Sequence, residues 1–518
     1  MKKSADFKTF EEATSPSILD SSLPSNKSSL VSSAVTILGT LSTTTAIVGV
    51  HHYYRKQQQP EARLVDYLTG LKAQLRSIPV LSTTATLFKS RIHNSYHQAK
   101  QARQQSAPDH ESLQKFTQAN TAPDFSAWHT TVLVLRPVCW ISGVSSMPNP
   151  SMPVPSMPVP IDSAMSTHMA SDERCFGVVG IDADRQIVWQ TTMPERVHDI
   201  VIQPKLDASL ATVKVCHVVV MGRRPSERFW VLDSASGQVK HAIKAGTDRH
   251  FYGHACYSLD GTQLYVTEND TVDLTGKIGI YDVNHDYRKT AEFGSHGIGP
   301  HELIMHPDSE TLIIANGGIK TEQASREELN LDSMRPALVY LNRHTGELLE
   351  QITPEHNQMS IRHLAMHDNG TVMIGIQFQG EKHLNVPLVL THQRGDAEFA
   401  ALSMPNNQWQ RFHQYIASVA VDSKNNLLCV TTPIGGCAAV YDLVTYELID
   451  SVTLLDCAGA SIVISEDEDK NKDRRTSFVV SDGQGQLTTI ALDKNSKQLT
   501  INSQSHNMAF DNHLQVLG

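Results

Sequence analysis

A histidine recurs at corresponding positions of the chain, each time beside a short apolar run. The segments are "VHDIVI" with His198, "GHACYS" with His254, "PHELIM" with His301 and "IRHLAMH" with His363. Neutral imidazoles and carboxylates together suit borderline divalent metals. We therefore predict a metal site whose ligands are His198, His254, His301, Glu302 and His363, and whose ion is iron, copper or zinc.

Other polar residues near these histidines are candidates for ligand binding. The dense segment "RHFYGHACYS" supplies Arg249 and Tyr252, and Arg362 directly precedes His363. The ends of the following apolar runs supply a second set, Glu268, Asn269, Asp270, Asn316 and Gln377. Arg223 and Arg224, in "MGRRPSERF", have the charge of an anion clamp, although a pair of solvated arginines is the alternative.

These residues can meet only if distant parts of the chain converge. From about residue 174, short runs rich in Val, Ile and Leu are broken by turn signals such as "SLDGTQ" and "HDNGTV". Repeated units can be anchored, by subtraction 42 to 62 residues apart, on His198, His254, His301, His363, Ser418, Ala460 and His513. This spacing predicts an all-β fold, a seven-bladed β-propeller with four strands per blade.

The propeller explains why the histidine recurs. The first strand of every blade lines the central channel, so residues repeated at its start are gathered around one axis. The last anchor has one strand left before Gly518, and we expect its outer strands to come from residues 175–194, which closes the ring. The structural alternative for each histidine is to satisfy backbone groups and ordered water in a polar channel.

The rest of the chain differs in composition. The uncharged run at 30–50 is long enough to span a bilayer, and its alternative is a buried helix of a soluble domain. The organisation we expect is a disordered polar N-terminus at 1–29, a transmembrane or signal anchor at 30–50, a polar helical stalk at 51–127, a strand-like segment with a Pro/Met-rich insertion at 128–173, and the propeller at 174–518.

Composition and missing motifs exclude several functions. The net charge is −10 and no basic stripe is present, which argues against a nucleic-acid partner. The seven cysteines are scattered without a Cys-x-x-Cys pair, so their spacing indicates neither a disulfide framework nor a thiolate zinc site. The chain also lacks a G-x-S-x-G elbow, a Walker loop, a Rossmann fingerprint after a strand, and H-E-x-x-H. The case for an enzyme therefore rests on geometry alone.

Long motifs resemble one bacterial family. "RHFYGHACYSLDGTQLYVTEND", "EFGSHGIGPHELIMHPDSETLIIANGGI" and "SIRHLAMHDNGTV" are similar to the family known as domain of unknown function 1513, over roughly 174–518. The resemblance implies a quinoprotein- or YVTN-like seven-bladed propeller, exported to the periplasm and encoded beside imelysin-like and di-haem proteins in iron-acquisition clusters. This chain departs from that pattern because it has no twin-arginine motif and carries the 30–50 segment instead.

Three functions are compatible with these observations. The first is a periplasmic propeller anchored to the inner membrane through residues 30–50, which binds metal on its axis and interacts with imelysin-like or di-haem proteins in iron or metal uptake. The second is a metal-dependent hydrolase of the gluconolactonase type that uses Glu268, Asn269, Asp270 and Glu302. The third is a scaffold with no small ligand.

Overall fold

The computed structural model describes residues 128–149, 174–204, 216–224, 226–321, 328–463, 477–493 and 496–517. The chain divides into two compact units, Met1–Ala107 and Pro108–Gly518, and every described residue lies in the second. The expected N-terminal tail, anchor and stalk, and most of the Pro/Met-rich insertion, lie outside the described residues. In the part that is described, no helix has the length and apolar character needed to cross a membrane.

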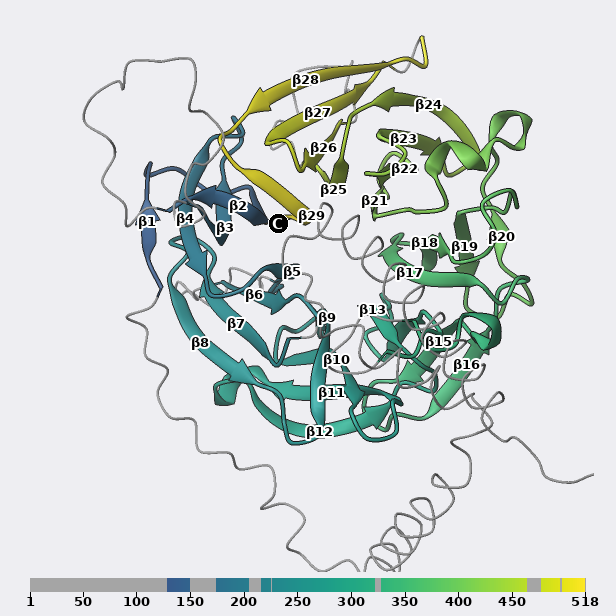
Figure 1. Ribbon diagram of the computed structural model, residues 1–518, viewed down its shortest axis with the longest axis horizontal. Coiled ribbons are helices and arrows are strands. Elements are labelled where there is room, and N and C mark those ends of the chain that lie inside the picture. The colour runs from purple at the N-terminus through teal and green to yellow at the C-terminus, as the bar shows by residue number, and fades with distance from the viewer. Residues whose placement is uncertain are drawn as a thin grey trace, which may run out of the picture. The chain divides into compact units, whose positions relative to one another are not determined.

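Seven antiparallel sheets surround a common axis, which confirms the seven-bladed β-propeller (Figure 1). Three four-stranded blades are formed by β5 (Val197–Ile202), β6 (His217–Gly222), β7 (Arg228–Asp233) and β8 (Val239–Lys244); by β9 (Arg249–Tyr257), β10 (Gln263–Asp270), β11 (Gly276–Asp282) and β12 (Arg288–Gly294); and by β13 (Pro300–Met305), β14 (Thr311–Asn316), β15 (Ala337–Asn342) and β16 (Leu348–Ile352). Three more are formed by β17 (Met359–Met366), β18 (Thr371–Phe378), β19 (Val389–Gln393) and β20 (Ala400–Ala401); by β21 (Ser418–Asp422), β22 (Leu427–Thr432), β23 (Cys437–Asp442) and β24 (Glu447–Thr453); and by β25 (Cys457–Ile462), β26 (Ser477–Asp482), β27 (Gln486–Leu492) and β28 (Leu499–Ser505).

The seventh blade joins the two ends of the described chain. Its strand order is β1 (Thr130–Val132), β4 (Ile187–Met193), β3 (Arg174–Ile181), β2 (Trp140–Pro148) and β29 (Ala509–Val516). Strands β3 and β4 come from the segment 175–194 that we expected to supply them. The expected start of the propeller at residue 174 is wrong, however, because β2 lies directly between β29 and β3.

The innermost strands form a closed ring. Neighbouring strands around the axis are β29, β5, β9, β13, β17, β21 and β25, and β25 in turn packs on β29. All seven predicted anchors lie on these strands. Two blades carry no histidine there, and in them Ser418 Oγ accepts a hydrogen bond from the backbone N–H of Ala460 at 3.3 Å.

Asp or Asn ends the third strand of several blades and builds the turn to the fourth. Asp233 Oδ1 accepts hydrogen bonds from the N–H groups of Ala235 and Ser236, and Asp442 Oδ1 accepts one from Val444. Short polar side chains stabilise turns in this way because they replace the hydrogen-bond partners that the backbone loses on leaving the sheet. The Asp/Asn turn that recurs in the sequence thus fixes the outermost hairpins.

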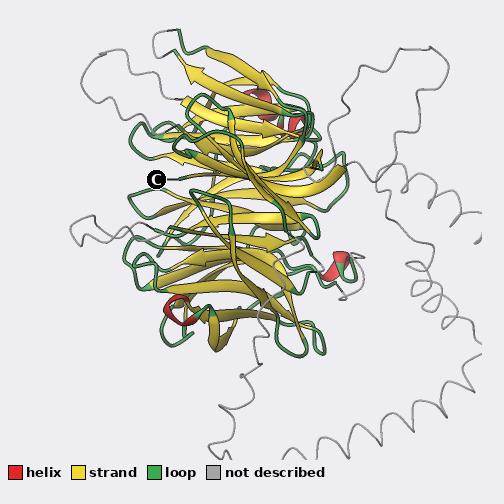
Figure 2. Ribbon diagram, turned by 90° about the vertical axis from the view of Figure 1, so that its left-hand side faces the viewer, coloured by secondary structure: helices red, strands yellow, loops and turns green. Residues whose placement is uncertain are grey.

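The core lies between the blades. Each sheet is covered on both faces by its neighbours, so the middle strands are apolar on both sides; all six residues of β22 are buried, for example. One apolar cluster joins Val219 of β6 to Val266 of β10, and another joins Tyr265 of β10 to Leu312 of β14. Figure 2 shows the stacked sheets from the side. The described residues also include four short 3-10 helices in loops: η6 (Val283–His285), η7 (Leu331–Ser333), η8 (Pro405–Asn407) and η9 (Trp409–Phe412).

Candidate metal centre

A β-bulge occurs at or beside every axial histidine. In β5, His198 and Asp199 together oppose a single residue of β6, and in β13, His301 and Glu302 together oppose a single residue of β14. The pairing of β9 shifts around His254, that of β29 around His513, and that of β17 directly before His363. Because a bulge bends a strand and re-aims its side chains, it explains how adjacent residues such as His198 and Asp199 both reach the axis.

Five imidazoles meet at this point. Four of them were predicted ligands, and His513, an anchor that was not predicted as a ligand, is the fifth. The centroid distances between rings are 4.4 Å for His254–His301, 4.6 Å for His198–His254, 5.0 Å for His301–His363, 5.1 Å for His198–His513 and His254–His513, and 5.6 Å for His363–His513. The predicted convergence of distant strands therefore produces a single cluster of rings.

Two carboxylates orient the imidazoles from neighbouring blades. Asp199 Oδ2 lies 3.2 Å from Nδ1 of His254, and its Oδ1 lies 3.5 Å from Nδ1 of His513. Glu302 Oε2 lies 3.2 Å from Nδ1 of His363 and accepts the backbone N–H of Leu364 at 3.0 Å. A carboxylate behind Nδ1 leaves Nε2 as the metal-binding atom, as in many metalloproteins. Glu302, predicted as a ligand, is thus placed to hold His363.

Several ring nitrogens in the cluster are buried without a hydrogen-bond partner. They are Nε2 of His254, Nε2 of His513, Nδ1 of His198 and Nδ1 of His301. Buried polar atoms are normally satisfied, so four unsatisfied nitrogens at one point mark a place for a ligand. Potential ligand atoms of His198, His254 and His513 all lie within 4.8 Å of one another. This set could hold a metal after a small inward movement, because zinc–nitrogen bonds are about 2.0–2.1 Å long.

Burial controls the protonation of the cluster. It holds the pKa of His198, His301 and His363 well below the usual value, with added repulsion from His254 in each case. It also lowers the pKa of His513 to about 4, although Asp199 opposes this effect. Burial likewise disfavours charge on His254, but Asp199 outweighs it and raises the pKa. Four imidazoles are therefore kept in the neutral form, which can donate a lone pair to a metal.

The two carboxylates differ in their own protonation. Burial raises the pKa of Glu302 to about 7, against the attraction of His254. Burial also acts to raise the pKa of Asp199, but His254 and His513 outweigh it, so the pKa of Asp199 is lowered. Asp199 is therefore the permanent negative charge of the cluster.

A cavity of about 430 Å³ adjoins the cluster. Asp199, Glu302, His363 and His513 line it, together with residues that follow the histidines on the inner strands, such as Met305 and Met366. The cavity therefore extends from the cluster toward the face where the inner strands end. Its volume is in the range of small-molecule sites.

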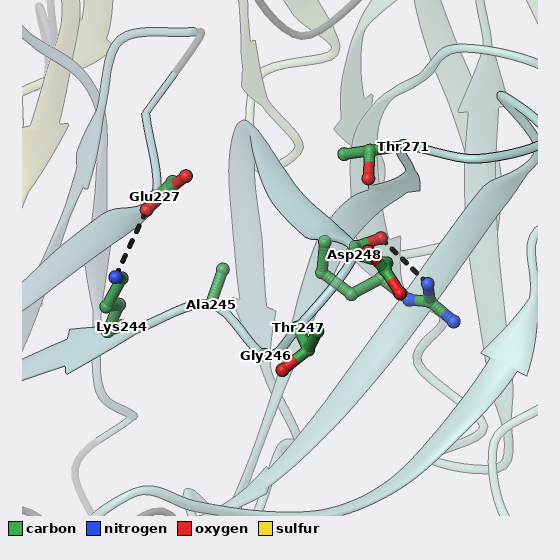
Figure 3. A pocket seen from close by; sticks show the side chains of 8 residues that line it. Glu227, Lys244, Ala245, Gly246, Thr247, Asp248 and Thr271 are labelled. Atoms are coloured by element: carbon green, nitrogen blue, oxygen red, sulfur yellow. Dashed lines mark hydrogen bonds and ion pairs between the residues drawn. The ribbon is translucent and has the colours of Figure 1, made fainter.

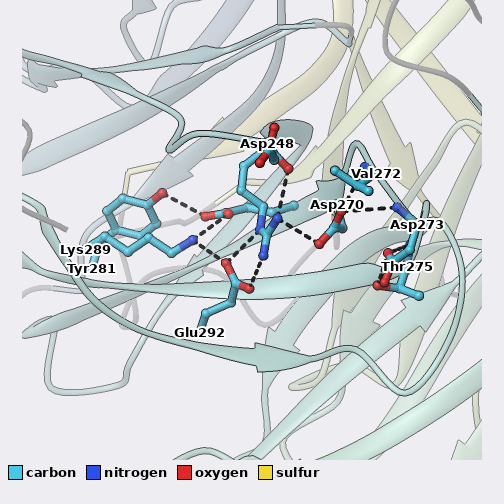
Figure 4. A network of polar contacts seen from close by, with 10 residues as sticks. Asp248, Asp270, Val272, Asp273, Thr275, Tyr281, Lys289 and Glu292 are labelled. Carbon is cyan, nitrogen blue, oxygen red and sulfur yellow. Dashed lines mark hydrogen bonds and ion pairs between the residues drawn. The ribbon is translucent and has the colours of Figure 1, made fainter. Parts of the chain in front are cut away.

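The predicted second set of polar residues does not join the cluster. Glu268 Oε1 accepts a hydrogen bond from Tyr281 at 2.8 Å, and its Oε2 pairs with Lys289 at 2.7 Å. Arg249 pairs with Asp270 at 2.9 Å and with Glu292 at 2.8 Å (Figure 4). All of these residues belong to the β9–β12 blade or its hairpins. The oxygen-ligand set that a gluconolactonase-type site requires is therefore not assembled from Glu268 and Asp270.

The remaining predicted ligand-binding residues have separate positions. Asn316 Oδ1 accepts at 2.9 Å from Oγ of Ser295, which directly follows β12 of the neighbouring blade, and Gln377 forms a β-bridge with Tyr415. Tyr252 and Arg362 lie beside the cluster, and Asn269 is fully buried with both amide atoms unpartnered.

A separate pocket of about 200 Å³, whose lining includes no histidine, lies between β8, β9 and the loop after β10 (Figure 3). Lys244 pairs there with Glu227 at 3.4 Å, and Arg249 donates to the backbone oxygen of Asp248 at 2.9 Å. Lys244, Glu227 and Arg249 thus already have partners, and Thr247 and Thr271 supply hydroxyl groups to the pocket.

These features define a seven-bladed β-propeller with a carboxylate-supported imidazole cluster on its axis. The chain belongs to the family described as "Protein of unknown function (DUF1513)", whose model matches residues 191–517. The match confirms the resemblance seen in the sequence motifs.

Comparison with solved structures finds a distant similarity. A chain of the hydrazine synthase of Kuenenia stuttgartiensis is similar at 15% identity and a TM-score of 0.43, and the match covers 63% of this chain and 89% of that one. A likeness at this level carries no argument about function. No curated protein matches the chain.

Proposed function

We propose that the protein binds one divalent transition metal on the propeller axis. The observation that carries the proposal is the set formed by His198, His254 and His513, whose ligand atoms lie within 4.8 Å of one another. Each of the three rings has a buried nitrogen without a hydrogen-bond partner. Imidazole ligands favour zinc, copper or iron over calcium and magnesium, which prefer oxygen.

Asp199 supports two of these ligands at once. Its two oxygens face Nδ1 of His254 and Nδ1 of His513, so it fixes both rings with Nε2 available to the metal. A neighbouring ring, that of His301, lies 4.4 Å from that of His254 and has a buried, unpartnered Nδ1. His301 is therefore the candidate for a fourth ligand.

The setting that we propose is a binding protein of the periplasm, anchored to the inner membrane through residues 30–50 and acting in metal uptake. Its proposed partners are imelysin-like or di-haem proteins. The support for this setting is the resemblance in sequence, together with a site built from imidazoles. Cell fractionation, followed by protease protection of the propeller in intact spheroplasts, tests the location.

Metal binding is tested on the chelator-treated full-length chain. When zinc is added back and the excess is removed by dialysis, we expect the protein to retain one equivalent of zinc. When cobalt is added instead, we expect the visible absorption of a low-coordinate nitrogen site. His198→Ala, His254→Ala and His513→Ala should each weaken zinc binding, and Asp199→Asn should do so by about 10–100-fold because it orients the ligands.

The matched control is His344→Ala. The His344 side chain is 50% exposed and pairs with Glu310 on the surface, so its loss should leave zinc binding unchanged. Zinc stoichiometry near zero in the wild type, or equal in His254→Ala, His513→Ala and the control, would refute the proposed metal centre.

A further inference from the structure

A second group of polar side chains lies on the other side of the imidazole cluster from the cavity. Tyr252 and Arg362 precede His254 and His363 on their strands, so they lie toward the face where the inner strands begin. Arg224 and Thr321 follow β6 and β14, which run antiparallel to the inner strands and end at the same face.

Arg362 places a positive charge at this face. It is the extra residue of the bulge in β17, and its Nε donates to Ser360 Oγ at 3.0 Å. Ser360 Oγ in turn donates to the backbone oxygen of Gly317 at 2.9 Å. Within the described part of the chain, Arg362 forms no ion pair with a carboxylate. Burial and the charge of Arg224 lower its pKa to about 10, which leaves it protonated at neutral pH.

Arg224 is held in place beside it. Its Cζ lies 4.8 Å from the centre of the Tyr252 ring, a cation–π geometry, and its Nη1 donates to Thr321 Oγ1 at 3.0 Å. Tyr252 Oη lies 3.2 Å from the same Thr321 oxygen. The guanidinium groups of Arg224 and Arg362 repel each other, yet both are held at the face where the inner strands begin. An anion bound by both groups would stabilise this arrangement.

Unpartnered buried groups adjoin the two arginines. His250 stacks on Tyr252 with ring centroids 5.6 Å apart, and it is opposite Asn269 in the pairing of β9 and β10. His250 and Asn269 are fully buried. Both ring nitrogens of His250 lack a hydrogen-bond partner, and so do both side-chain amide atoms of Asn269. Groups of this kind are uncommon in folded proteins and provide hydrogen-bonding capacity for a ligand.

We propose that this face binds a small oxyanion, a carboxylate or a phosphate, between Arg362 and Arg224, with Tyr252, His250 and Asn269 as its surroundings. Planar guanidinium groups match the paired oxygens of both anions. The inference does not depend on the proposed metal, because none of these side chains belongs to the set of three imidazoles.

The test is a calorimetric titration of the chelator-treated full-length chain with inorganic phosphate and, separately, with malonate, at constant ionic strength. We expect saturable binding of at least one probe. The probe that binds more tightly shows whether the site prefers a phosphate or a carboxylate. Arg362→Gln and Arg224→Gln should each weaken that binding about tenfold or more, the loss expected for hydrogen bonds to a charged group. Arg362→Lys keeps the positive charge but loses the planar guanidinium with its paired N–H donors, so it should weaken anion binding less.

Arg288→Gln is the control, because it removes the same charge from an exposed residue of the outer strand β12. Absence of saturable binding of both probes refutes the proposal, as does binding in Arg362→Gln and Arg362→Lys equal to that of Arg288→Gln. Thermal unfolding of every variant shows whether it is folded. If Arg362→Gln does not fold, the anion affinities of Arg362→Lys and Arg224→Gln test the proposal instead. Because metal is removed beforehand, failure here leaves the metal proposal standing, and the reverse also holds.

Discussion

Gly253 allows the imidazoles of neighbouring blades to approach each other. Its φ is +103°, which L side chains rarely adopt, and it lies one residue before His254. A Cβ at this position would lie 2.7 Å from Cδ2 of His198, closer than real side chains approach. The backbone of β9 is therefore shaped to accept the ring that β5 contributes.

Gly253→Ala should weaken zinc binding while all five histidines remain. The added methyl group displaces the His198 ring from the other two proposed ligands, His254 and His513, and the strained backbone lowers the free energy of unfolding by about 1–3 kcal/mol. Zinc titration and denaturant unfolding measure the two effects separately.

Gly395→Ala is the control for strain. Gly395 has a φ of +97°, but a Cβ there would meet no atom within 4 Å. We expect a similar loss of stability with unchanged zinc affinity. Equal zinc affinity in Gly253→Ala and Gly395→Ala would show that the close approach to His198 does not matter for the metal.

The sequence predicts four of the five axial histidines but not their roles. His198, His254, His301 and His363 were found because they recur at strand starts, and Glu302 because it adjoins one of them. Asp199 directly follows His198, just as Glu302 follows His301. The same pattern, a carboxylate next to an axial histidine, could therefore have predicted Asp199. The bulges that turn adjacent residues toward the axis depend on pairing with another strand, so no local pattern predicts them.

At the scale of one element, the β9–β12 blade carries its own ion-pair network. Glu292 contacts both Arg249 and Lys289, the latter at 2.7 Å, and Lys289 also holds Glu268 (Figure 4). Burial opposes the charge of Glu292, but Arg249 and Lys289 outweigh it and lower the pKa to about 2. This pKa links the stability of the blade to pH.

Glu292→Gln should reduce stability at pH 7 by up to about 3 kcal/mol, and much less near pH 3. Because the folded-state pKa is below the usual value of 4.5, ionised Glu292 stabilises the fold fully above about pH 4.5. That contribution is lost as the pH falls toward 2. Denaturant unfolding of both proteins across this range measures the difference.

Glu347→Gln, a change at an exposed carboxylate of the loop after β15, is the control and should have little effect at either pH. A Glu292→Gln penalty that stays constant from pH 7 to pH 3 would contradict the ion-pair origin of the stabilisation.

The elements themselves follow from local sequence. Apolar runs separated by turn residues predict strands because their physical causes are local, as the Asp233 and Asp442 turns show. Glu268 and Asp270 were predicted as candidates for ligand binding near the histidines, but they form ion pairs inside their own blade instead. Lys289 and Arg249, which attract them, come from other strands of the blade, and sequence spacing does not reveal this pairing.

At the scale of the whole molecule, the ring is closed by strands from both ends of the described chain. β29 supplies His513 and Asp511, and Asp511 pairs with Arg196 of the next blade at 2.6 Å. β2 covers β29 and donates from Trp140 Nε1 to the backbone oxygen of Ile462 in the preceding blade at 3.0 Å. The sequence did not identify β2 because the insertion of prolines after it separates it from β3.

A chain that lacks residues 1–149 should therefore be less stable than one that lacks residues 1–127. Loss of β1 and β2 leaves the edges of β29 and β3 unpaired, and the free edges should also promote aggregation. We expect a lower unfolding temperature and weaker zinc binding, because β29 carries His513, one of the three proposed ligands. Calorimetry and zinc titration of both chains and of the full chain provide the measurement.

Similar unfolding temperatures of the two shortened chains would mean that β2 contributes little to closure. A loss of stability already present in the chain that lacks only 1–127 would instead place the decisive contacts before residue 128.

The position of β29 also affects how the protein matures. His513 is the last of the five axial histidines to leave the ribosome, after all of the other six blades have been made. A nascent chain therefore has two of the three proposed ligands and lacks the third until the ring can close. A chain that is still being synthesised would therefore bind metal weakly. Strong metal binding would indicate that the last blade is complete.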